Sequence, residues 1–267
     1  MLREGSGEPL LLLHGIISGE RTWLRVIPHL SGEFDVIATT ALGHNGGPSP
    51  TRRPATMADV FDAAEKQLDD LGIERAHLAG NSMGGWAALE LARRGRALSV
   101  CAICPAGLWD EDWEEADRER VFAILLGAVR DTRRGRRLIP LLARSRRFRK
   151  WASRDFSVNG DRVSREGFVI GAEDVVGCEI AEELIVPGVR FEGYDPPHCP
   201  VTIALGEQDK LFPPALYEAR AKDLVPAARV LVLEGVGHVP MADDPELIAR
   251  TIRDSTRSAA ALSSPGS

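Results

Sequence analysis

The sequence lacks any apolar run approaching the roughly 20 residues that a membrane-spanning helix needs. Its first residues, Met1 to Gly5, also lack the basic stretch followed by an apolar stretch that marks a secretory signal. We therefore expect no membrane span and a cytoplasmic location.

Cysteine is scarce, with four residues in 267. Cys101 and Cys104 form a C-x-x-C pattern, but they lie in the apolar run Leu98–Cys104, which predicts a buried strand. Positions i and i+3 of a strand point to opposite faces about 10 Å apart, which is too far for a disulfide. Cys178 and Cys199 have no tight spacing that would suggest zinc ligands. We expect structural thiols in a reducing compartment, no metal site and no cofactor.

Positive charge is in deficit overall, and the net charge of −6 argues against general affinity for nucleic acid. A content of 44% hydrophobic and 27% charged residues excludes a disordered or fibrous chain. The charge is uneven, because residues 130–154 contain eleven Lys or Arg and one acidic residue. These cations could steer an anionic substrate or hold the protein to acidic lipid. The interpretation that we favour is a solvated helix facing the acidic run Asp110–Glu119.

Short apolar runs alternate with helical patterns, which is typical of an α/β protein with a mostly parallel sheet covered by helices on both faces. Six runs predict its strands: Leu10–Leu13, Phe34–Ala38, Ala76–Ala79, Leu98–Ile103, Val201–Leu205 and Val230–Leu233. Thr56 and Asp59 can form a capping box that begins one helix, and Gly72 suits its end. Pro245 suits the first turn of the last helix.

The alternation of strands and helices is interrupted between Pro105 and His198, an interval far longer than the roughly 2–6 residues of a typical strand-to-helix loop. We expect a core formed by residues 1–106 and 171–257, with a helical cap, residues 107–170, inserted into it. Residues 172–186 are expected to return to the core as a helix that covers the sheet. Residues 258–267 are expected to form a disordered tail.

The sharpest local signal is Gly80-Asn81-Ser82-Met83-Gly84-Gly85, which directly follows a predicted strand and precedes a helix. This is G-x-S-x-G in the strand–turn–helix context of a nucleophile elbow. The flanking glycines permit a strained turn that presents the Ser82 hydroxyl at the carboxyl edge of the sheet. A glycine-rich turn with an incidental serine is the alternative.

A serine hydroxyl is a weak nucleophile at neutral pH, so it needs a base and an acid that orients the base. His238 follows the last predicted strand at the carboxyl edge of the sheet, whereas His198 precedes a strand at the opposite edge. Asp209 follows the strand Val201–Leu205, which predicts a triad of Ser82, Asp209 and His238. Asp209 could instead cap the next helix, and the alternative acids are Asp110, Asp112 and Glu207.

The same chemistry requires an oxyanion hole, formed by two backbone N–H groups. Met83, directly after the nucleophile, is expected to supply one. The other is expected from Ile16, because the run Leu10–Leu13 ends in His14-Gly15-Ile16 at the same edge. We expect His14 itself to be structural.

Together these motifs resemble the α/β-hydrolase superfamily, and the resemblance extends from Gly7 to about Arg257. Leu10–Gly15 resembles the family's oxyanion strand, Trp23–Leu30 its first helix, and Gly43–Ser49 its substrate-side loop. Gly80–Gly85 resembles the elbow, Gly206–Asp209 the acid turn, and Gly237–Pro245 the histidine turn. The resemblance implies that the cap is inserted after the sixth family strand. Because few residues precede Leu10, one or both opening strands are expected to be short or absent.

The substrate contacts are expected near the loop and the cap. His44 could hydrogen-bond substrate, although a loop role is favoured. Val239, directly after the predicted base, is a further candidate. Aromatic and apolar residues of the cap could line an acyl pocket or form the cap's own core, namely Trp109, Trp113, Phe122, Leu125, Leu126, Phe148 and Trp151.

The resemblance implies an acyl-enzyme mechanism, and we expect a serine esterase that hydrolyses a carboxylic ester of a small molecule. Serine at the elbow weighs against the haloalkane dehalogenase and epoxide hydrolase branches, which resemble this fold but use Asp there. A C–C bond hydrolase of the meta-cleavage type is the alternative, although Val239 stands where those enzymes usually carry an aromatic residue. Thioester, lactone or amide hydrolysis and a non-catalytic binding role also remain. The chain could form a homodimer.

Overall fold

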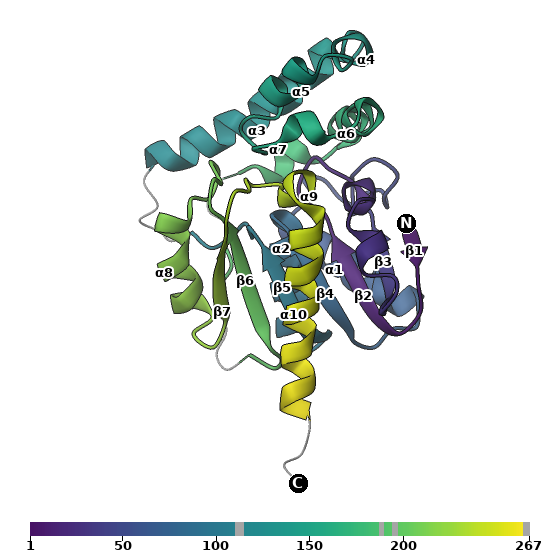
Figure 1. The fold of residues 1–267 in the computed structure, drawn as a ribbon, viewed down its shortest axis with the longest axis vertical. Helices are drawn as coiled ribbons and strands as arrows, with labels where there is room; N and C mark the ends of the chain where they lie inside the picture. The colour runs from purple at the N-terminus through teal and green to yellow at the C-terminus, as the bar shows by residue number, and fades with distance from the viewer. Residues whose placement is uncertain (110–114, 187–189, 194–196, 264–267) are drawn as a thin grey trace.

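The central element of the fold is one seven-stranded sheet. The computed structural model describes residues 1–109, 115–186, 190–193 and 197–263. Within them the strand order is β1-β3-β2-β4-β5-β6-β7 (Figure 1). The strands are β1 (Leu2–Glu4), β2 (Glu8–Leu13), β3 (Phe34–Thr39), β4 (Ala76–Asn81), β5 (Ala97–Ile103), β6 (Val201–Gly206) and β7 (Arg229–Leu233). All neighbours pair in parallel except β1 and β3, so the predicted α/β architecture is confirmed.

The fold opens with a three-residue strand. β1 pairs antiparallel with β3, and Leu2 lies opposite Ala38. Arg3 and Asp35 form an ion pair across the two strands, with Nη2 and Oδ2 2.6 Å apart. The apolar-run pattern does not find β1, because two of its three residues are charged.

Helices cover both faces of the sheet, because successive strand side chains point to opposite sides. On one face Leu11 and Leu13 pack in a core with α1 (Met57–Asp70), α2 (Met83–Arg93) and α8 (Pro214–Leu224). On the other face Leu10 and Leu12 pack with the 3-10 helices η1 (Glu20–Trp23) and η2 (Ile27–His29) and with α10 (Pro245–Ser263). α10 continues past Ser258, where a tail was expected, and residues 264–267 lie outside the described residues.

Local sequence signals fix α1 as expected. Thr56 and Asp59 form the capping box, in which the Thr56 hydroxyl accepts the Asp59 N–H and the Asp59 carboxylate accepts the Thr56 N–H. The helix buries Val60, Ala64 and Leu68 on one face. It is followed by Gly72 at φ +69°, the left-handed conformation that ends helices and favours glycine.

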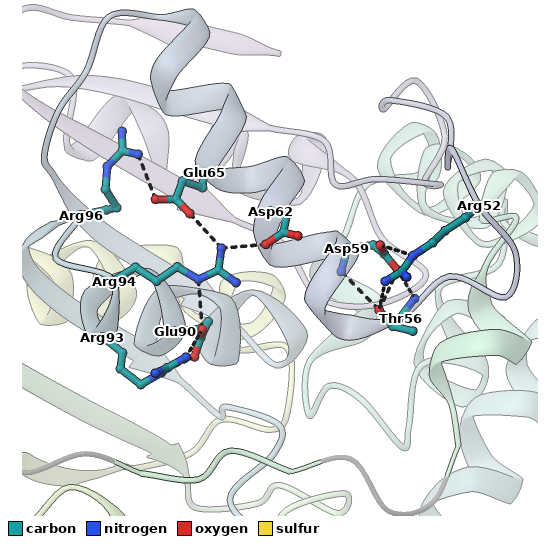
Figure 2. A network of polar contacts seen from close by, with 9 residues as sticks. All are labelled: Arg52, Thr56, Asp59, Asp62, Glu65, Glu90, Arg93, Arg94 and Arg96. Carbon is teal, nitrogen blue, oxygen red and sulfur yellow. Dashed lines mark hydrogen bonds and ion pairs between the residues drawn. The ribbon is translucent and has the colours of Figure 1, made fainter.

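An ion-pair network joins α1 to α2 and the turn after it (Figure 2). Arg94 donates to Asp62 and Glu65 of α1, both at 2.8 Å, and to Glu90 of α2 at 3.0 Å. Glu90 is also paired with Arg93 at 2.7 Å. The network braces the helix that follows the predicted elbow against its neighbour.

A helical insertion separates β5 from β6. It contains α3 (Glu115–Gly135), α4 (Ile139–Leu142), α5 (Arg146–Ala152), η3 (Gly160–Arg162), α6 (Arg165–Gly177) and α7 (Ala181–Leu184), and we refer to residues 115–186 as the inserted segment. These helices form a layer beyond one edge of the sheet (Figure 1). Within this layer, α3 packs against the core through Val121, Leu125 and Val129, which are spaced four residues apart and buried.

Residues 172–186 do not form the expected helix over the sheet. The expected boundary at residue 171 falls inside α6, which packs against α3 and η1. Asp174 is the one buried residue of α6. It is ion-paired with Arg21 and accepts a hydrogen bond from Asn45 at 3.0 Å. α6 docks through these polar contacts at Asp174 and through Val175, which packs against the core, and it ends at Gly177, so it does not continue over the sheet.

All four cysteines are free and buried. Cys101 and Cys104 nevertheless pack in the same core, so their expected placement on opposite faces is wrong. The reason is that β5 ends at Ile103, and Cys104 turns away from the strand path at φ +44°. Across the described residues, no helix combines the length and apolar character needed to span a bilayer.

Candidate active site

Ser82 occupies a sharp turn between β4 and α2. Its φ of +55° lies in the left-handed region, where a residue with a Cβ is strained. A Cβ on Gly80 would lie 2.1 Å from Gly84 O, and one on Gly84 would lie 2.2 Å from Leu13 O. Glycine is therefore required at both positions for the turn to close. The strand, the turn and the helix have the arrangement expected of a nucleophile elbow.

His238 and Asp209 form a buried pair at the ends of the neighbouring strands β7 and β6. Nδ1 of His238 lies 2.7 Å from Oδ2 of Asp209. The other carboxylate oxygen accepts the N–H groups of Leu211 at 2.8 Å and Phe212 at 2.9 Å. Burial alone would raise the pKa of Asp209, but the charge of His238 and these hydrogen bonds outweigh it and lower the pKa. Asp209 is thus a carboxylate that fixes the orientation of the imidazole.

Asn81 connects the elbow to the loop that carries His238. Its Nδ2 donates to His238 O at 2.9 Å and to Ile103 O at 3.2 Å. The residue before the candidate nucleophile therefore touches the backbone of the candidate base. Sequence reasoning missed this role, because the second position of G-x-S-x-G carries no constraint in the motif.

Cys104 packs beside the pair. The thiol lies 3.8 Å from Gly237 O and accepts the Gly206 N–H at 3.3 Å, so it contacts both loops. Its sulfur and the ligand atoms of Asp209 and His238 lie within 4.8 Å of one another, a spacing that a metal ion could use. Burial, reinforced by the charge of Asp209, raises the pKa of Cys104 well above its ordinary value. Because the thiol contacts the backbone of both loops, we assign Cys104 to packing.

The two residues expected to supply oxyanion donors, Met83 and Ile16, line the same pocket as Ser82. Met83 is the first residue of α2, so its N–H has no acceptor within the helix. A Cβ on Gly15 would lie 3.3 Å from the Ser82 Cβ, which shows how closely the loop after β2 approaches the nucleophile. The next residue, Ile17, is held at φ +56° and donates its N–H to His44 Nε2 at 3.2 Å.

His14 and His44 are structural residues of this loop. His14 Nδ1 lies 2.8 Å from Gly15 O, and its Nε2 accepts the Ala41 N–H at 2.9 Å. His44 Nδ1 lies 2.9 Å from Leu42 O. Burial lowers the pKa of His14 to about 4 and that of His44 to about 3. Both rings are buried and bonded to the backbone, which agrees with the structural role expected of His14 and the loop role favoured for His44, and His44 is absent from the described lining of the pocket at Ser82.

The pocket at Ser82 is almost entirely apolar and holds about 60 Å³ of free volume. Ser82 is the one residue with a side-chain hydroxyl or charge among its described lining residues. The others are Ile16, Met57, Met83, Trp86, Ala106, Trp109, Val121, Phe122, Leu125, Leu184, Ile185, Val186, Leu211 and Phe212. Both the core and the inserted segment contribute to this wall.

Only some of the residues expected to contact substrate line the pocket at Ser82. Trp109, Phe122 and Leu125 line the pocket. Val239 packs in the core near α10 and donates its N–H to Phe156 O at 2.8 Å. Leu126, Phe148 and Trp151 do not line it, and Trp113 lies outside the described residues.

Of the alternative acids and base, neither Glu207 nor His198 forms a hydrogen bond with Asp209 or His238 in the described structure. Glu207 accepts the Gly235 N–H at 2.9 Å and is exposed. His198 precedes β6 at the edge of the sheet opposite Asp209. Asp110 and Asp112 lie outside the described residues. Asp209 does not cap the next helix, because α8 has Pro213 at its N-cap and no side-chain cap; one Asp209 oxygen instead accepts the Leu211 and Phe212 N–H groups while the other contacts His238.

Asp243 is a second residue that sequence reasoning missed. It is 1% exposed. Its carboxylate accepts the N–H groups of Gly237 at 2.9 Å, Val158 at 3.1 Å and Asn159 at 2.6 Å. The loop of His238 is thereby tied to the inserted segment. The only sequence signal is the pair Asp243-Asp244 before Pro245, in which Asp244 caps α10 and leaves Asp243 free to turn inward.

Comparison with known proteins shows the family of the chain. The alpha/beta hydrolase family model matches residues 10–251. Epoxide hydrolase EphH of Mycobacterium tuberculosis is 35% identical over 211 residues, which cover 74% of this chain and 93% of that protein.

Two solved structures share the fold. A thermophilic esterase from Thermogutta terrifontis superposes with a TM-score of 0.73 at 23% identity, covering 97% of this chain and 92% of the other. A meta-cleavage product hydrolase from Pseudomonas fluorescens superposes with a TM-score of 0.69 at 19% identity, covering 98% and 93%. With the family match spanning the sheet, the elbow and the His238 loop, the chain belongs to the alpha/beta hydrolase family.

Proposed function

We propose that this protein is a serine hydrolase that cleaves carboxylic esters of small apolar molecules. The observation that carries the proposal is the pocket at Ser82, in which one hydroxyl faces an otherwise apolar wall. The buried pair of His238 and Asp209 at the same edge supplies the base and its orienting acid. The inserted segment acts as the cap that closes this pocket.

The reaction follows from these roles. His238 Nε2 takes the proton of the Ser82 hydroxyl as the oxygen attacks the ester carbonyl carbon. The N–H groups of Ile16 and Met83 stabilise the negative charge that develops on the carbonyl oxygen. His238 then returns the proton to the leaving alcohol, and an acyl group remains on Ser82. Water, activated by His238, cleaves this acyl-enzyme.

The nucleophile distinguishes esters from epoxides, although the relative EphH is named an epoxide hydrolase. A carboxylate that opens an epoxide forms an ester, which water can cleave at its carbonyl. A serine that opens an epoxide forms an ether, which has no carbonyl and would not turn over. Ser82 therefore favours an acyl substrate. C–C bond, thioester, lactone and amide cleavage share the acyl chemistry and differ only in the leaving group.

The test is a series of p-nitrophenyl esters from acetate to octanoate, run beside styrene oxide. We expect ester turnover that falls by at least about 10³-fold in Ser82→Ala, since removing a triad nucleophile leaves only binding and oxyanion stabilisation. The matched control is Ser6→Ala, because Ser6 is an exposed serine between β1 and β2. Intact-mass labelling by a fluorophosphonate should add one adduct to the wild type and none to Ser82→Ala. A folded wild type that hydrolyses styrene oxide and no ester would overturn the proposal.

A further inference from the structure

Three leucines are exposed together on the inserted segment. Leu138, Leu141 and Leu142 are 59%, 59% and 42% exposed. They lie within one helical turn at α4, whose buried residue is Ile139. The turn therefore uses one side chain to hold its place and presents three to solvent. Exposed apolar side chains that gather in this way mark interaction surfaces more often than isolated ones do.

The same stretch carries a surplus of cations. Residues 132–154 contain ten Lys or Arg and no acidic residue. Some of these side chains hold the segment together: Arg133 pairs with Glu182 at 2.6 Å, and the buried Arg149 donates to Ala143 O at 2.7 Å. Six others are exposed and have no ion-pair partner among the residues that the structure describes: Arg134, Arg136, Arg137, Arg144, Arg147 and Lys150.

The structure does not support the expected pairing of this stretch with the acidic run Asp110–Glu119. α3 carries Asp117 and Glu119 near its start, whereas Arg133 and Arg134 lie in its last turn. Twenty-one helical residues span about 31 Å, so these groups are far apart. Residues 110–114 lie outside the described residues. The exposed leucines lie at α4, and the exposed cations lie at the end of α3, in the turns that flank α4, and on α5, which Figure 1 draws together in the layer beyond the sheet.

We propose that residues 134–151, the basic leucine patch, dock this protein on an anionic lipid membrane. The leucines would enter the boundary between headgroups and acyl chains, and the cations would meet lipid phosphates and carboxylates. Trp151, 61% exposed with the Arg154 guanidinium 4.9 Å from its ring centroid, suits the same boundary. The proposal concerns attachment to a surface and is independent of the reaction at Ser82.

Two other occupants fit the patch less well. A nucleic acid would neutralise the cations but would leave the three leucines in water. A second copy that presented the same patch would place like charges face to face. An anionic bilayer satisfies both the charged and the apolar side chains.

The test is cosedimentation with vesicles of phosphatidylcholine alone and of phosphatidylcholine with 30% phosphatidylserine. We expect binding to the anionic vesicles at 0.1 M salt, at least tenfold weaker binding to the neutral ones, and a marked loss at 0.5 M salt. Each cation at the membrane contributes roughly fivefold in affinity, so Arg136→Gln/Arg137→Gln/Arg144→Gln/Arg147→Gln should bind more than about 100-fold more weakly. Leu141→Ser/Leu142→Ser should bind the anionic vesicles at least about tenfold more weakly than the wild type does.

Matched controls separate the patch from general surface effects. Leu24→Ser/Leu216→Ser removes leucines that are 49% and 50% exposed elsewhere. Arg250→Gln/Arg257→Gln removes exposed arginines of α10, 56% and 68% exposed. Both should bind vesicles like the wild type. Trp151→Phe should abolish most of the blue shift in tryptophan fluorescence on binding.

Four outcomes overturn the proposal. The first is equal binding to both vesicle types, and the second is wild-type binding by the leucine variant. The third is tighter binding to a DNA duplex than to vesicles, with no effect of the leucine substitutions. The fourth is a dimer in sedimentation that is monomeric in the leucine variant. Circular dichroism of each variant confirms that it is folded. Because Ser82→Ala must bind vesicles like the wild type, failure of the esterase proposal and failure of this one are distinguishable.

Discussion

Asn81 donates a hydrogen bond to the carbonyl oxygen of His238, 2.9 Å away, and so joins the elbow of the nucleophile to the loop of the base. The amide also donates to Ile103 O, which accepts the Ser82 N–H as well, and all three residues are buried. In the proposed mechanism Asn81 touches no reacting atom and positions the His238 loop relative to Ser82.

Asn81→Ala is therefore expected to lower kcat for ester hydrolysis by about 10- to 100-fold with a smaller change in KM, because geometry at the base is lost and the apolar pocket is not. The buried His238 O loses its donor, whereas Ile103 O keeps the Ser82 N–H at 2.9 Å, so the free energy of unfolding should fall by about 1–3 kcal/mol. The rate of fluorophosphonate labelling of Ser82 measures the positioning directly and should fall in parallel. A destabilised variant that labels at the wild-type rate would show that Asn81 has a purely structural role.

Asp209→Asn should reduce kcat by about 10⁴-fold, because the Leu211 and Phe212 N–H groups retain the amide oxygen, so the amide NH2 faces His238 Nδ1 as a donor and the tautomer needed for proton transfer is lost. Glu207→Gln is the matched control, two residues away and bonded to Gly235 N instead of His238. It should retain wild-type kcat. The measurement is steady-state hydrolysis of the best ester, and equal losses in the two variants would exclude Asp209 as the specific partner of His238.

Acid should destabilise the fold first through the two buried histidines and then, below about pH 4, through Asp209 as well. His14 and His44 accept backbone N–H groups at Nε2, so both are neutral when folded, with pKa values of about 4 and 3. An unfolded histidine titrates near pH 6.5. Between pH 6.5 and about 4 the unfolded chain binds more protons, so stability falls as the pH falls. Asp209, whose pKa is lowered in the fold, adds its loss only below about pH 4.

Between pH 6.5 and about 4, each of the two histidines contributes up to about 1.4 kcal/mol per pH unit. We expect His44→Gln, which removes one of them, to reduce the slope of unfolding free energy against pH by about 1 kcal/mol per unit. Urea unfolding at pH 7, 6 and 5 measures this slope. An unchanged slope in the variant would mean that His44 is charged in the folded protein.

Leu125→Ala should enlarge the pocket and shift ester preference to longer acyl chains. Filling the vacated space with about two methylenes is worth roughly 0.8 kcal/mol each, so the ratio of kcat/KM for octanoate to that for butyrate should rise about tenfold. Val129→Ala is the control, one turn further along α3, buried but absent from the pocket wall. Both substitutions cost stability, and only the first should change the preference.

The sequence predicts the elements whose cause is local. The six apolar runs, the Thr56 capping box and the glycines of the elbow each specify a backbone conformation within a few residues. Parallel strands then place Ser82, Asp209 and His238 at one edge without any knowledge of packing. For this reason the fold and the pairing of Asp209 with His238 follow from the sequence.

The direction in which a polar side chain turns is set by distant partners, and it was not predictable. The sequence leaves open whether His44 contacts substrate, although it favours a loop role, and only the contacts with Ile17 N and Leu42 O show that the ring is bonded to the backbone. The sequence predicts that residues 172–186 form a helix over the sheet, but in the structure Asp174 contacts Arg21 and Asn45 instead. Asn81 and Asp243 are bonded to backbone groups far along the chain, which no periodicity encodes.

The contacts of Asp243 determine which segments could be exchanged between related proteins in a chimera. Two of its three donors, Val158 and Asn159, belong to the inserted segment, and the third, Gly237, precedes His238. A chimera that replaced residues 115–186 as a block would keep the buried carboxylate and remove the backbone geometry that matches it. The interchangeable unit of this hydrolase is therefore the inserted segment together with the Gly237–Asp243 loop, and grafts that divide the two would misplace the base.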